Sequence, residues 1–353
     1  MREFPCTSRG VVYSWVTPRV AMYAKWARFF GSLTRDPQTD GDFGVPAIGY
    51  THPCGAAYCI RDGGDIGNGG YGCVYVYKVV EPCAGVPEEF CVKCITHDAQ
   101  AEVYAVRALS ALTQMDMTLK GFVPAAVLRE NGEFADVGMP LYRRTLSSKK
   151  MTIGAAMAVV AAVTSVVIRL WDAGLAYTDV KTSNVLEANK ACVVLCDLGS
   201  IVPRRAHDGS YPQGLFTFPP RRSIDPVYED EDGVVTPREY DVVWSLGTLL
   251  MTLTHGTPFV ITRFTGAALR AMAADASHMS ARVRLHKACS TVADETRREF
   301  EYMRATDGVA GIRCANAINV AIDAWAEKPN ATLDAFLSAL KGGPPRRRKS
   351  SPS

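Results

Sequence analysis

The sequence predicts a mixed α+β fold, in which a small strand-rich N-terminal region precedes a larger helical region. Two patterns predict it. Between residues 58 and 80 the chain carries β-forming runs such as 74–77, and after about residue 143 apolar residues recur at helical spacing. The composition is 48% hydrophobic and 21% charged, which is ordinary for a globular chain and excludes a collagen, a coiled coil and a wholly disordered protein.

We divide the 353 residues into four parts. An N-terminal extension covers residues 1–57, a strand-rich lobe 58–142, a helical lobe 143–341, and a basic tail 342–353. The tail combines Gly, Pro, Ser and Arg and cannot bury a core, so we expect it to be disordered.

The extension is predicted to contain one helix over residues 14–33, in which Thr17 can cap and Pro18 suits the first turn. Its apolar face predicts packing against the body of the protein, and contact with a membrane surface or a partner is the alternative. Residues 34–55 are rich in Gly, Pro and Asp and are predicted to be a connecting loop.

The remaining elements follow from periodicity and from Gly and Pro punctuation. In the strand-rich lobe we expect strands at 58–80, 90–93, 122–128 and 134–139, and a helix at 99–113. In the helical lobe we expect helices at 152–172, 239–254, 265–275, 279–302 and 313–325.

Residues 151–168 contain no charged side chain and just reach the roughly 18 apolar residues that a membrane span needs. The segment also contains polar residues and leads directly to Arg169 and Asp172, and Gly174 can end a helix there. A buried helix is therefore the favoured interpretation, and we expect no membrane span.

The net charge of +3 comes from residues 341–353, which hold Lys341, Lys349 and three arginines and no acid. Without these five cations, 34 basic residues face 36 acidic ones, a net charge of −2. A near-neutral body argues against direct nucleic-acid binding. The run 346–349 is a candidate nuclear-import signal, with a merely solvating tail as the alternative.

Cysteine usage indicates a reducing, intracellular compartment. The chain has 11 cysteines, an odd and scattered set, and its first residues lack the apolar run of a secretory signal. Its CxxC pair, Cys91 and Cys94, supplies only half of a tetrahedral metal site.

A glycine-rich motif covers residues 67–74, Gly-Asn-Gly-Gly-Tyr-Gly-Cys-Val. Glycine permits tight turns and a close approach of the backbone to phosphate. A dinucleotide-binding fold would place a helix after such glycines, whereas here a strand is predicted to follow. Strand, glycine loop and strand form the phosphate-covering hairpin of protein kinases, and a hairpin without a ligand is the alternative.

Lys93 lies near the end of a predicted half-buried strand, 19 residues after Val74. A lysine there needs a partner, and a phosphate and a helix carboxylate would supply two. Glu102, on the following predicted helix, is the nearest candidate carboxylate. The alternative is that Lys93 reaches solvent along the edge of the lobe.

The most specific pattern runs from Asp179 to Asp197. Asp179 can accept the proton of an attacking hydroxyl, Lys181 can neutralise a transferring phosphoryl group, and Asn184 offers an oxygen to Mg²⁺. Asp197, 18 residues after Asp179 and beyond a short hairpin, can hold the metal ion that bridges the phosphates of ATP.

With these motifs in this order, the chain resembles the protein kinase superfamily over roughly residues 58–340. The run 241–247 resembles the Asp-x-Trp-Ser-x-Gly helix of that family, 218–221 lies where it has Ala-Pro-Glu, 139–142 resembles its hinge, and 324–329 its last conserved segment.

The resemblance implies a bilobal kinase fold that uses ATP and Mg²⁺ on protein substrates, with Asp179, Lys181 and Asn184 as catalytic residues and Asn184 and Asp197 as metal ligands. It implies nucleotide contacts from Ile66, Gly67, Asn68, Gly69, Gly70, Tyr71, Gly72, Val74, Lys93, Glu102 and Met139. Lys181 is the choice typical of serine/threonine kinases.

The chain also departs from the family pattern. Tyr177 and Thr178 replace the usual His and Arg before the catalytic Asp, and Leu198 replaces Phe after the metal-binding Asp. Arg221 replaces the Glu of Ala-Pro-Glu, and Lys328 replaces the Arg partner of that Glu. None of these changes removes a group that handles phosphate, metal or proton.

With its divergent motifs, its compact arrangement of two lobes and its short basic tail, the chain is similar to the herpesvirus-encoded serine/threonine kinases. That similarity implies work in the host nucleus on host and viral proteins, and possible packaging in the virion. Two other functions stay open: a pseudokinase-type binding module without turnover, and a kinase-fold enzyme that phosphorylates a small molecule.

Overall fold

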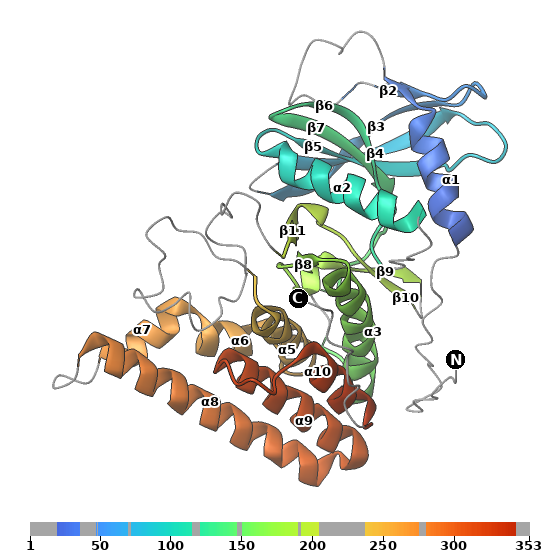
Figure 1. Ribbon diagram of the computed structural model, residues 1–353. Helices are drawn as coiled ribbons and strands as arrows, with labels where there is room; N and C mark the ends of the chain where they lie inside the picture. Colours follow the sequence, from blue (N-terminus) through green and yellow to red (C-terminus); the bar gives the residue numbers. More distant parts are fainter. Residues whose placement is uncertain are drawn as a thin grey trace. The chain divides into compact units, whose positions relative to one another are not determined.

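The computed structural model describes residues 20–35, 47, 49–69, 72–114, 121–146, 150–189, 192–204, 237–274 and 280–343. They form a mixed α+β molecule with a curled antiparallel sheet of N-terminal strands and a helical C-terminal part (Figure 1). Two compact units can be separated. The sheet unit contains the described residues of 16–144 and 194–202, and the helical unit those of 145–193 and 203–353.

The sheet unit is built on seven antiparallel strands in the order β1-β2-β3-β4-β5-β7-β6. Their bounds are β1 (Thr34–Arg35), β2 (Gly49–Thr51), β3 (Ala57–Gly69), β4 (Gly72–Glu81), β5 (Glu89–Ile95), β6 (Ala126–Asn131) and β7 (Phe134–Pro140). The expectation that 34–55 is only a loop is wrong, because β1 and β2 lie within it and β2 pairs with β3.

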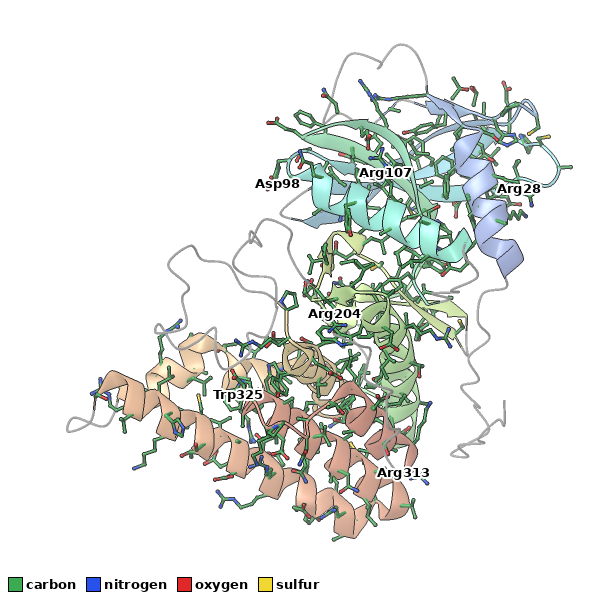
Figure 2. All side chains as sticks on the ribbon, in the orientation of Figure 1. Arg28, Asp98, Arg107, Arg204, Arg313 and Trp325 are labelled. Atoms are coloured by element: carbon green, nitrogen blue, oxygen red, sulfur yellow. The ribbon has the colours of Figure 1, made fainter. Side chains whose placement is uncertain are left out.

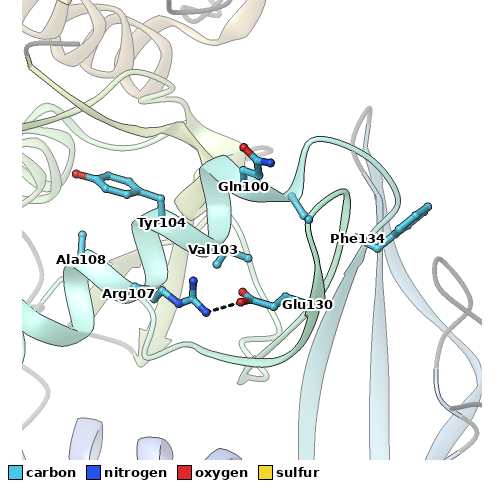
Figure 3. Close-up of a pocket in the computed structure, with 9 residues that line it drawn as sticks. Gln100, Val103, Tyr104, Arg107, Ala108, Glu130 and Phe134 are labelled. Atoms are coloured by element: carbon cyan, nitrogen blue, oxygen red, sulfur yellow. Dashed lines mark hydrogen bonds and ion pairs between the residues drawn. The ribbon is translucent and has the colours of Figure 1, made fainter. Parts of the chain in front are cut away.

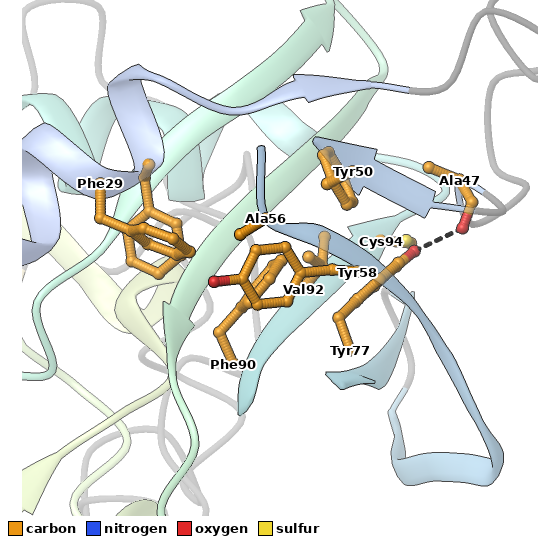
Figure 4. Close-up of a cluster of buried hydrophobic side chains, with 10 residues drawn as sticks. Phe29, Ala47, Tyr50, Ala56, Tyr58, Tyr77, Phe90, Val92 and Cys94 are labelled. Carbon is orange, nitrogen blue, oxygen red and sulfur yellow. Dashed lines mark hydrogen bonds between the residues drawn. The ribbon is translucent and has the colours of Figure 1, made fainter. Parts of the chain in front are cut away.

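Helix α1 (Val20–Gly31) covers one face of this sheet through an aromatic cluster (Figure 4). Phe29 and Phe30 pack edge-on against Phe90, which stacks on Tyr77 with ring centroids 5.3 Å apart. Burying each such ring stabilises the fold by about 1.5–3 kcal/mol. The described residues of the extension thus belong to the sheet unit, and residues 14–19 of its predicted helix lie outside the described residues.

Residues of β5 alternate between the two faces of the sheet. Phe90, Val92 and Cys94 belong to the aromatic cluster beneath α1, so Cys91 and Lys93 point to the opposite face. Cys91 and Cys94 therefore project in opposite directions and cannot hold one metal ion together. Helix α2 (Ala99–Gln114) follows β5 and meets Lys93 on that opposite face.

The helical unit packs its helices around two tryptophans. Trp325, labelled in Figure 2, lies among these helices. Trp244 stacks on Trp325 with ring centroids 5.4 Å apart, and Phe264 packs edge-on against both. The helices are α3 (Ile153–Asp172), α5 (Glu239–His255), α6 (Thr257–Phe264), α7 (Gly266–Ala274), α8 (Ala281–Thr306), α9 (Gly308–Trp325) and α10 (Leu333–Lys341). The sequence did not predict α6 and α10.

Helix α3 begins at the cap Thr152, whose side chain accepts a hydrogen bond from the amide of Ala155, and ends before Gly174, which has a φ of +85°. Among the helices of the described residues, α3 alone is long and apolar enough to cross a membrane, and 56% of its apolar window is buried inside the protein. The described part of the chain is therefore not that of a multi-span membrane protein.

Candidate active site

The glycine motif forms the tip of the antiparallel β3–β4 hairpin, with Gly69 paired to Gly72. Gly70 and Tyr71 lie outside the described residues, as does the side chain of Asn68. A Cβ on Gly72 would lie 2.1 Å from the carbonyl oxygen of Cys94, so only glycine lets β4 approach β5 this closely. The strand, glycine and strand order expected from the sequence is present.

The other residues expected to contact a nucleotide lie mostly in one patch on the face of the sheet opposite α1. Val74 pairs directly with Lys93, which pairs with Val137 on its other side. Met139 is half-buried and pairs with Cys91 of β5. Cys91 lies two residues before Lys93, so Met139, Cys91 and Lys93 share one face of the sheet. Ile66 is 49% exposed, so its side chain lies largely in solvent.

Lys93 joins two carboxylates within the sheet unit. Its ammonium lies 2.5 Å from Oε2 of Glu102 and 3.0 Å from Oδ1 of Asp197. The side chain of Glu102 is 6% exposed and that of Asp197 is 34% exposed. The structure thus contains the ion pair expected between Lys93 and Glu102, and it adds Asp197 as a second partner.

The electrostatics of this cluster follow from its burial. Burial alone would lower the pKa of Lys93, but the charges of Glu102 and Asp197 raise it above its usual value, so this ammonium keeps its proton. Burial raises the pKa of Glu102, and the Lys93 ammonium opposes that rise. One cation therefore compensates two carboxylates, one of which faces solvent and can take a further cation.

The segment that carries Asp197 belongs to the sheet unit. Leu195 exchanges backbone hydrogen bonds with Gly121 and Val123, at 2.6 and 2.8 Å. Asp197 itself has the uncommon left-handed φ of +57°. This contact was not predicted because it joins segments more than 70 residues apart.

Two neighbours of Asp197 were also not predicted. A Cβ on Gly199 would lie 3.3 Å from Oε2 of Glu102, so glycine lets the turn Leu198–Ser200 approach α2. The hydroxyl of Ser200 donates a 3.4 Å hydrogen bond to Oδ2 of Asp197. The only sequence signal for Ser200 is its position three residues after Asp197.

A second cluster lies in the helical unit, between β8 (Leu175–Tyr177) and β9 (Val185–Asn189). Oδ2 of Asp179 lies 2.5 Å from Nζ of Lys181 and accepts a 3.0 Å hydrogen bond from Nδ2 of Asn184. Nδ2 also donates to the backbone carbonyl of Asp179 at 3.0 Å. The three predicted catalytic side chains therefore converge on one carboxylate.

The helix expected to support this cluster begins at Glu239. The buried carboxylate of Asp241 accepts a 2.7 Å hydrogen bond from the backbone amide of Arg238 and so caps α5. Lys328 lies 2.8 Å from Oδ1 of Asp323, which also binds Arg297. Lys328 thus has an acidic partner of its own, and Arg221 lies outside the described residues.

The donor set fits Mg²⁺ better than a transition metal. No group of three His, Cys, Asp or Glu side chains suited to a metal ion occurs in the ranges that the structure describes. Mg²⁺ is commonly held by one or two protein oxygens together with substrate phosphates. Within the sheet unit, the Asp197 carboxylate is a ligand of that kind. Within the helical unit, so is the amide oxygen of Asn184, whose nitrogen binds Asp179.

A pocket of about 390 Å³ lies elsewhere on the sheet unit, between α2 and the β6–β7 turn (Figure 3). It is lined by Val103, Tyr104 and Phe134, and the ion pair of Arg107 with Glu130 crosses it. None of the predicted site residues lines it.

No protein-family model and no curated protein matches this chain. The chemistry of the site must therefore follow from its own residues.

Proposed function

We propose that this chain is a serine/threonine protein kinase with a bilobal fold, which transfers the γ-phosphate of ATP to protein hydroxyl groups. The observation that carries the proposal is the position of Lys93, whose ammonium binds Glu102 on α2 and Asp197 at the same time. A lysine fixed by a helix carboxylate and beside a half-exposed carboxylate is suited to hold nucleotide phosphates and their metal ion together.

In this proposal the sheet unit binds the nucleotide. The glycine tip offers backbone amides to phosphate oxygens, and Lys93 neutralises part of the phosphate charge. Val74 and Met139 offer apolar surface to the adenine base. Asp197 and Asn184 would hold Mg²⁺, which supplies positive charge to the phosphates when bound.

The helical unit supplies proton handling. Asp179 accepts the proton of the substrate hydroxyl, and its carboxylate is oriented by Lys181 and Asn184. Lys181, 33% exposed, offers its ammonium to the transferring phosphoryl group as well. A protein hydroxyl is the proposed acceptor because the chain retains the Lys181 typical of serine/threonine kinases.

We further propose that the kinase is viral, of the herpesvirus type, and acts in the host nucleus on host and viral proteins. The support is the resemblance of its divergent motifs, in which buried Tyr177 and Thr178 stand before the catalytic Asp. The basic run 346–349, which lies outside the described residues, supports a nuclear location.

The test is a transfer assay with purified chain, labelled ATP, Mg²⁺ and a generic protein substrate, followed by phosphoamino-acid analysis. We expect phosphoserine and phosphothreonine. The Lys93→Met variant should lose transfer, and Lys78→Met, at an exposed lysine of the same sheet, should retain it. ATP binding without transfer would indicate a binding module, and label only in a small acceptor would indicate a small-molecule kinase.

The Asp179→Asn variant tests the proposed base. Asn has the same shape, so the fold and nucleotide affinity should be unchanged, while single-turnover transfer falls by about 10²–10⁴-fold because the proton acceptor is lost. Asp172→Asn, at an exposed carboxylate that ends α3, serves as the control. Near-normal transfer by Asp179→Asn would show that another group accepts the proton.

A further inference from the structure

Two cysteines lie on neighbouring turns at one end of the sheet unit. Ala57 at the start of β3 pairs with Glu81 at the end of β4, so the turns that precede β3 and follow β4 lie side by side. Cys54 occupies the first turn and Cys83 the second, and all ten cysteines of the described residues are thiols. Cys54 is exposed and Cys83 half-exposed, so small reagents can reach both.

The two thiols lie close enough to interact, because the turns that carry them flank the Ala57–Glu81 pair. The interaction with Cys54 is the largest of the causes that raise the pKa of the Cys83 thiol above its usual value. Tyr58 lies beside the pair: burial, and then the two cysteines, raise its pKa to about 12. Its hydroxyl donates a 2.8 Å hydrogen bond to the carbonyl of Pro87, which ties the segment between β4 and β5 to strand β3.

A histidine is in position to take a proton from Cys54. Nδ1 of His52 lies 3.0 Å from Sγ of Cys54 and also accepts a 3.2 Å hydrogen bond from the amide of Cys54. An Nδ1 that accepts a hydrogen bond carries a lone pair, so it can also receive the thiol proton. The ring stacks on Phe29 of α1 at a centroid distance of 5.6 Å, which fixes its orientation.

We propose that Cys54 and Cys83 form a reversible disulfide, with Cys54 as the attacking thiolate, Cys83 as the resolving thiol and His52 as the base. The oxidant is a low-molecular-weight disulfide such as oxidised glutathione. The Cys54 thiolate forms a bond to one sulfur of that disulfide, and the other sulfur leaves as a thiolate and is protonated. Cys83 then loses its proton and attacks Sγ of Cys54, which expels the second small thiol. The two cysteines together lose two electrons and two protons, and the small disulfide gains both.

The position of this pair sets its structural effect. Residues 54 and 83 enclose the whole β3–β4 hairpin, whose glycine tip lies at the opposite end from the cysteines. The disulfide would therefore close the base of the hairpin covalently and leave the tip unchanged. The inference does not depend on the proposed kinase function.

The experiment is incubation of the whole purified chain with mixtures of oxidised and reduced glutathione, quenched by alkylation and read by intact mass and peptide mapping. The unmodified chain should lose the mass of two hydrogens and yield a peptide pair linked through Cys54 and Cys83. Cys83→Ser should instead stop at a glutathione adduct on Cys54, and Cys54→Ser should form neither product. Cys59→Ser, at an exposed cysteine of the same sheet, should behave as the unmodified chain.

His52→Gln should slow the alkylation of Cys54 by about tenfold, because the ring nitrogen that lies 3.0 Å from Sγ and can take the thiol proton is lost. The proposal is overturned if the unmodified chain yields glutathione adducts without the Cys54–Cys83 link. It is also overturned if Cys83→Ser is modified on Cys59 as fast as on Cys54. Mapping of the unmodified chain needs no variant, so a misfolded variant does not obscure the result.

Discussion

At Lys93 one ammonium stands between two carboxylates, and the balance of charge there depends on that single side chain. Glu102 is almost fully buried, and its charged form is tolerated because Lys93 lies 2.5 Å away. Removal of one member of a buried ion pair leaves an uncompensated charge, whereas removal of both leaves a neutral gap. The stabilities of a single and a double variant can therefore be compared to test the ion pair, and no assay of activity is needed.

The Lys93→Met variant should be less stable than the unmodified chain by about 3–5 kcal/mol near neutral pH. Burial already raises the pKa of Glu102, and loss of the ammonium raises it further, so the folded state binds this proton more tightly than the unfolded state. Stability should therefore fall as pH rises from about 4.5, the unfolded pKa, through the folded pKa.

Urea unfolding of the variant at a series of pH values between 4.5 and 8 measures this slope. The double variant Lys93→Met/Glu102→Gln is the matched control, because it lacks the titrating carboxyl and should show a flatter profile with part of the stability restored. A single variant as stable at neutral pH as at acid pH would show that Glu102 is not held in a buried pair.

At the scale of single elements, local patterns were predictable and long-range pairing was not. The glycine hairpin, Lys93 and the Asp179 cluster could be located because each depends on residues close together in sequence. Strands β1 and β2 escaped prediction because they are only 2 and 3 residues long and lie in a Gly- and Pro-rich stretch. They are strands because β3 and the aromatic cluster hold them.

Helix α3 likewise shows that a local sequence pattern does not reveal what surrounds an element. Its sequence alone is apolar enough for a span, and only its packing within the helical unit shows 56% of that stretch buried by protein. Apolar composition alone left the membrane span open, and the polar residues and the Gly174 cap favoured the buried helix. The same holds for the Asp197 segment, whose partners Gly121 and Val123 lie far away in sequence.

Helices α5 and α9 approach closely at Gly247, within the run that resembles the kinase Asp-x-Trp-Ser-x-Gly helix. A Cβ on Gly247 would lie 2.1 Å from Cβ of Ala321. Gly247→Ala should therefore destabilise the fold by about 1–3 kcal/mol through overpacking. Ala321→Gly in the same chain should recover part of this loss, and Gly343→Ala, where no atom lies within 4 Å, should cost little.

Thermal or urea unfolding of the single and double variants forms a double-mutant cycle for the α5–α9 contact. Additive effects of Gly247→Ala and Ala321→Gly would contradict direct contact between the two positions. A favourable interaction energy would show that the glycine is needed for close helix packing, separately from any role of Asp241.

The surroundings of His255, at the end of α5, predict that the helical unit loses stability in acid. Its ring packs against Phe259 and Phe300, at centroid distances of 4.9 and 4.6 Å. Burial lowers its pKa, as do Lys150 and Arg263, and Glu299 only partly opposes them. The unfolded state therefore takes up this proton more readily than the folded state.

Stability should consequently be lost as pH falls from about 6.5, the unfolded pKa, through the lower folded pKa. His255→Phe keeps an aromatic ring in the same packing and should remove this part of the pH dependence. Unfolding midpoints measured between pH 5 and 7.5 show the change, and His286→Phe, at an exposed histidine of α8, should leave the profile unaltered. An unaltered slope in His255→Phe would assign the acid sensitivity to another group.

At the scale of the whole molecule, the candidate chemistry is divided between the two units. Lys93, Glu102 and Asp197 belong to the sheet unit, and Asp179, Lys181 and Asn184 to the helical unit. The chain crosses from one unit to the other on both sides of 194–202, so one short segment carries Asp197, the proposed metal ligand, into the sheet unit. The proposed transfer reaction needs both sets, which is why variants in either unit should abolish it.

The basic tail is considered at the scale of the whole molecule because its proposed role concerns where the protein works. Residue 343 ends the described part of the helical unit, and Arg346, Arg347, Arg348 and Lys349 follow it. If this run is an import signal, truncation after Gly343 should move a tagged protein from the nucleus toward the cytoplasm, because the cations that an import receptor would bind are removed. The assigned catalytic residues all precede the cut, so transfer activity and the unfolding midpoint should stay unchanged.

Replacement of the four basic residues by Gln tests charge without a change in length, and Ser350→Ala is the control for the tail sequence itself. We expect the Gln variant to match the truncation and Ser350→Ala to match the full chain in quantitative imaging of transfected cells. An unchanged distribution of both the truncated and the Gln variants would mean that the tail only solvates the C-terminus. A move toward the cytoplasm that is accompanied by loss of transfer activity would mean instead that the tail contributes to the fold. That result would contradict its proposed role as a nuclear-import signal.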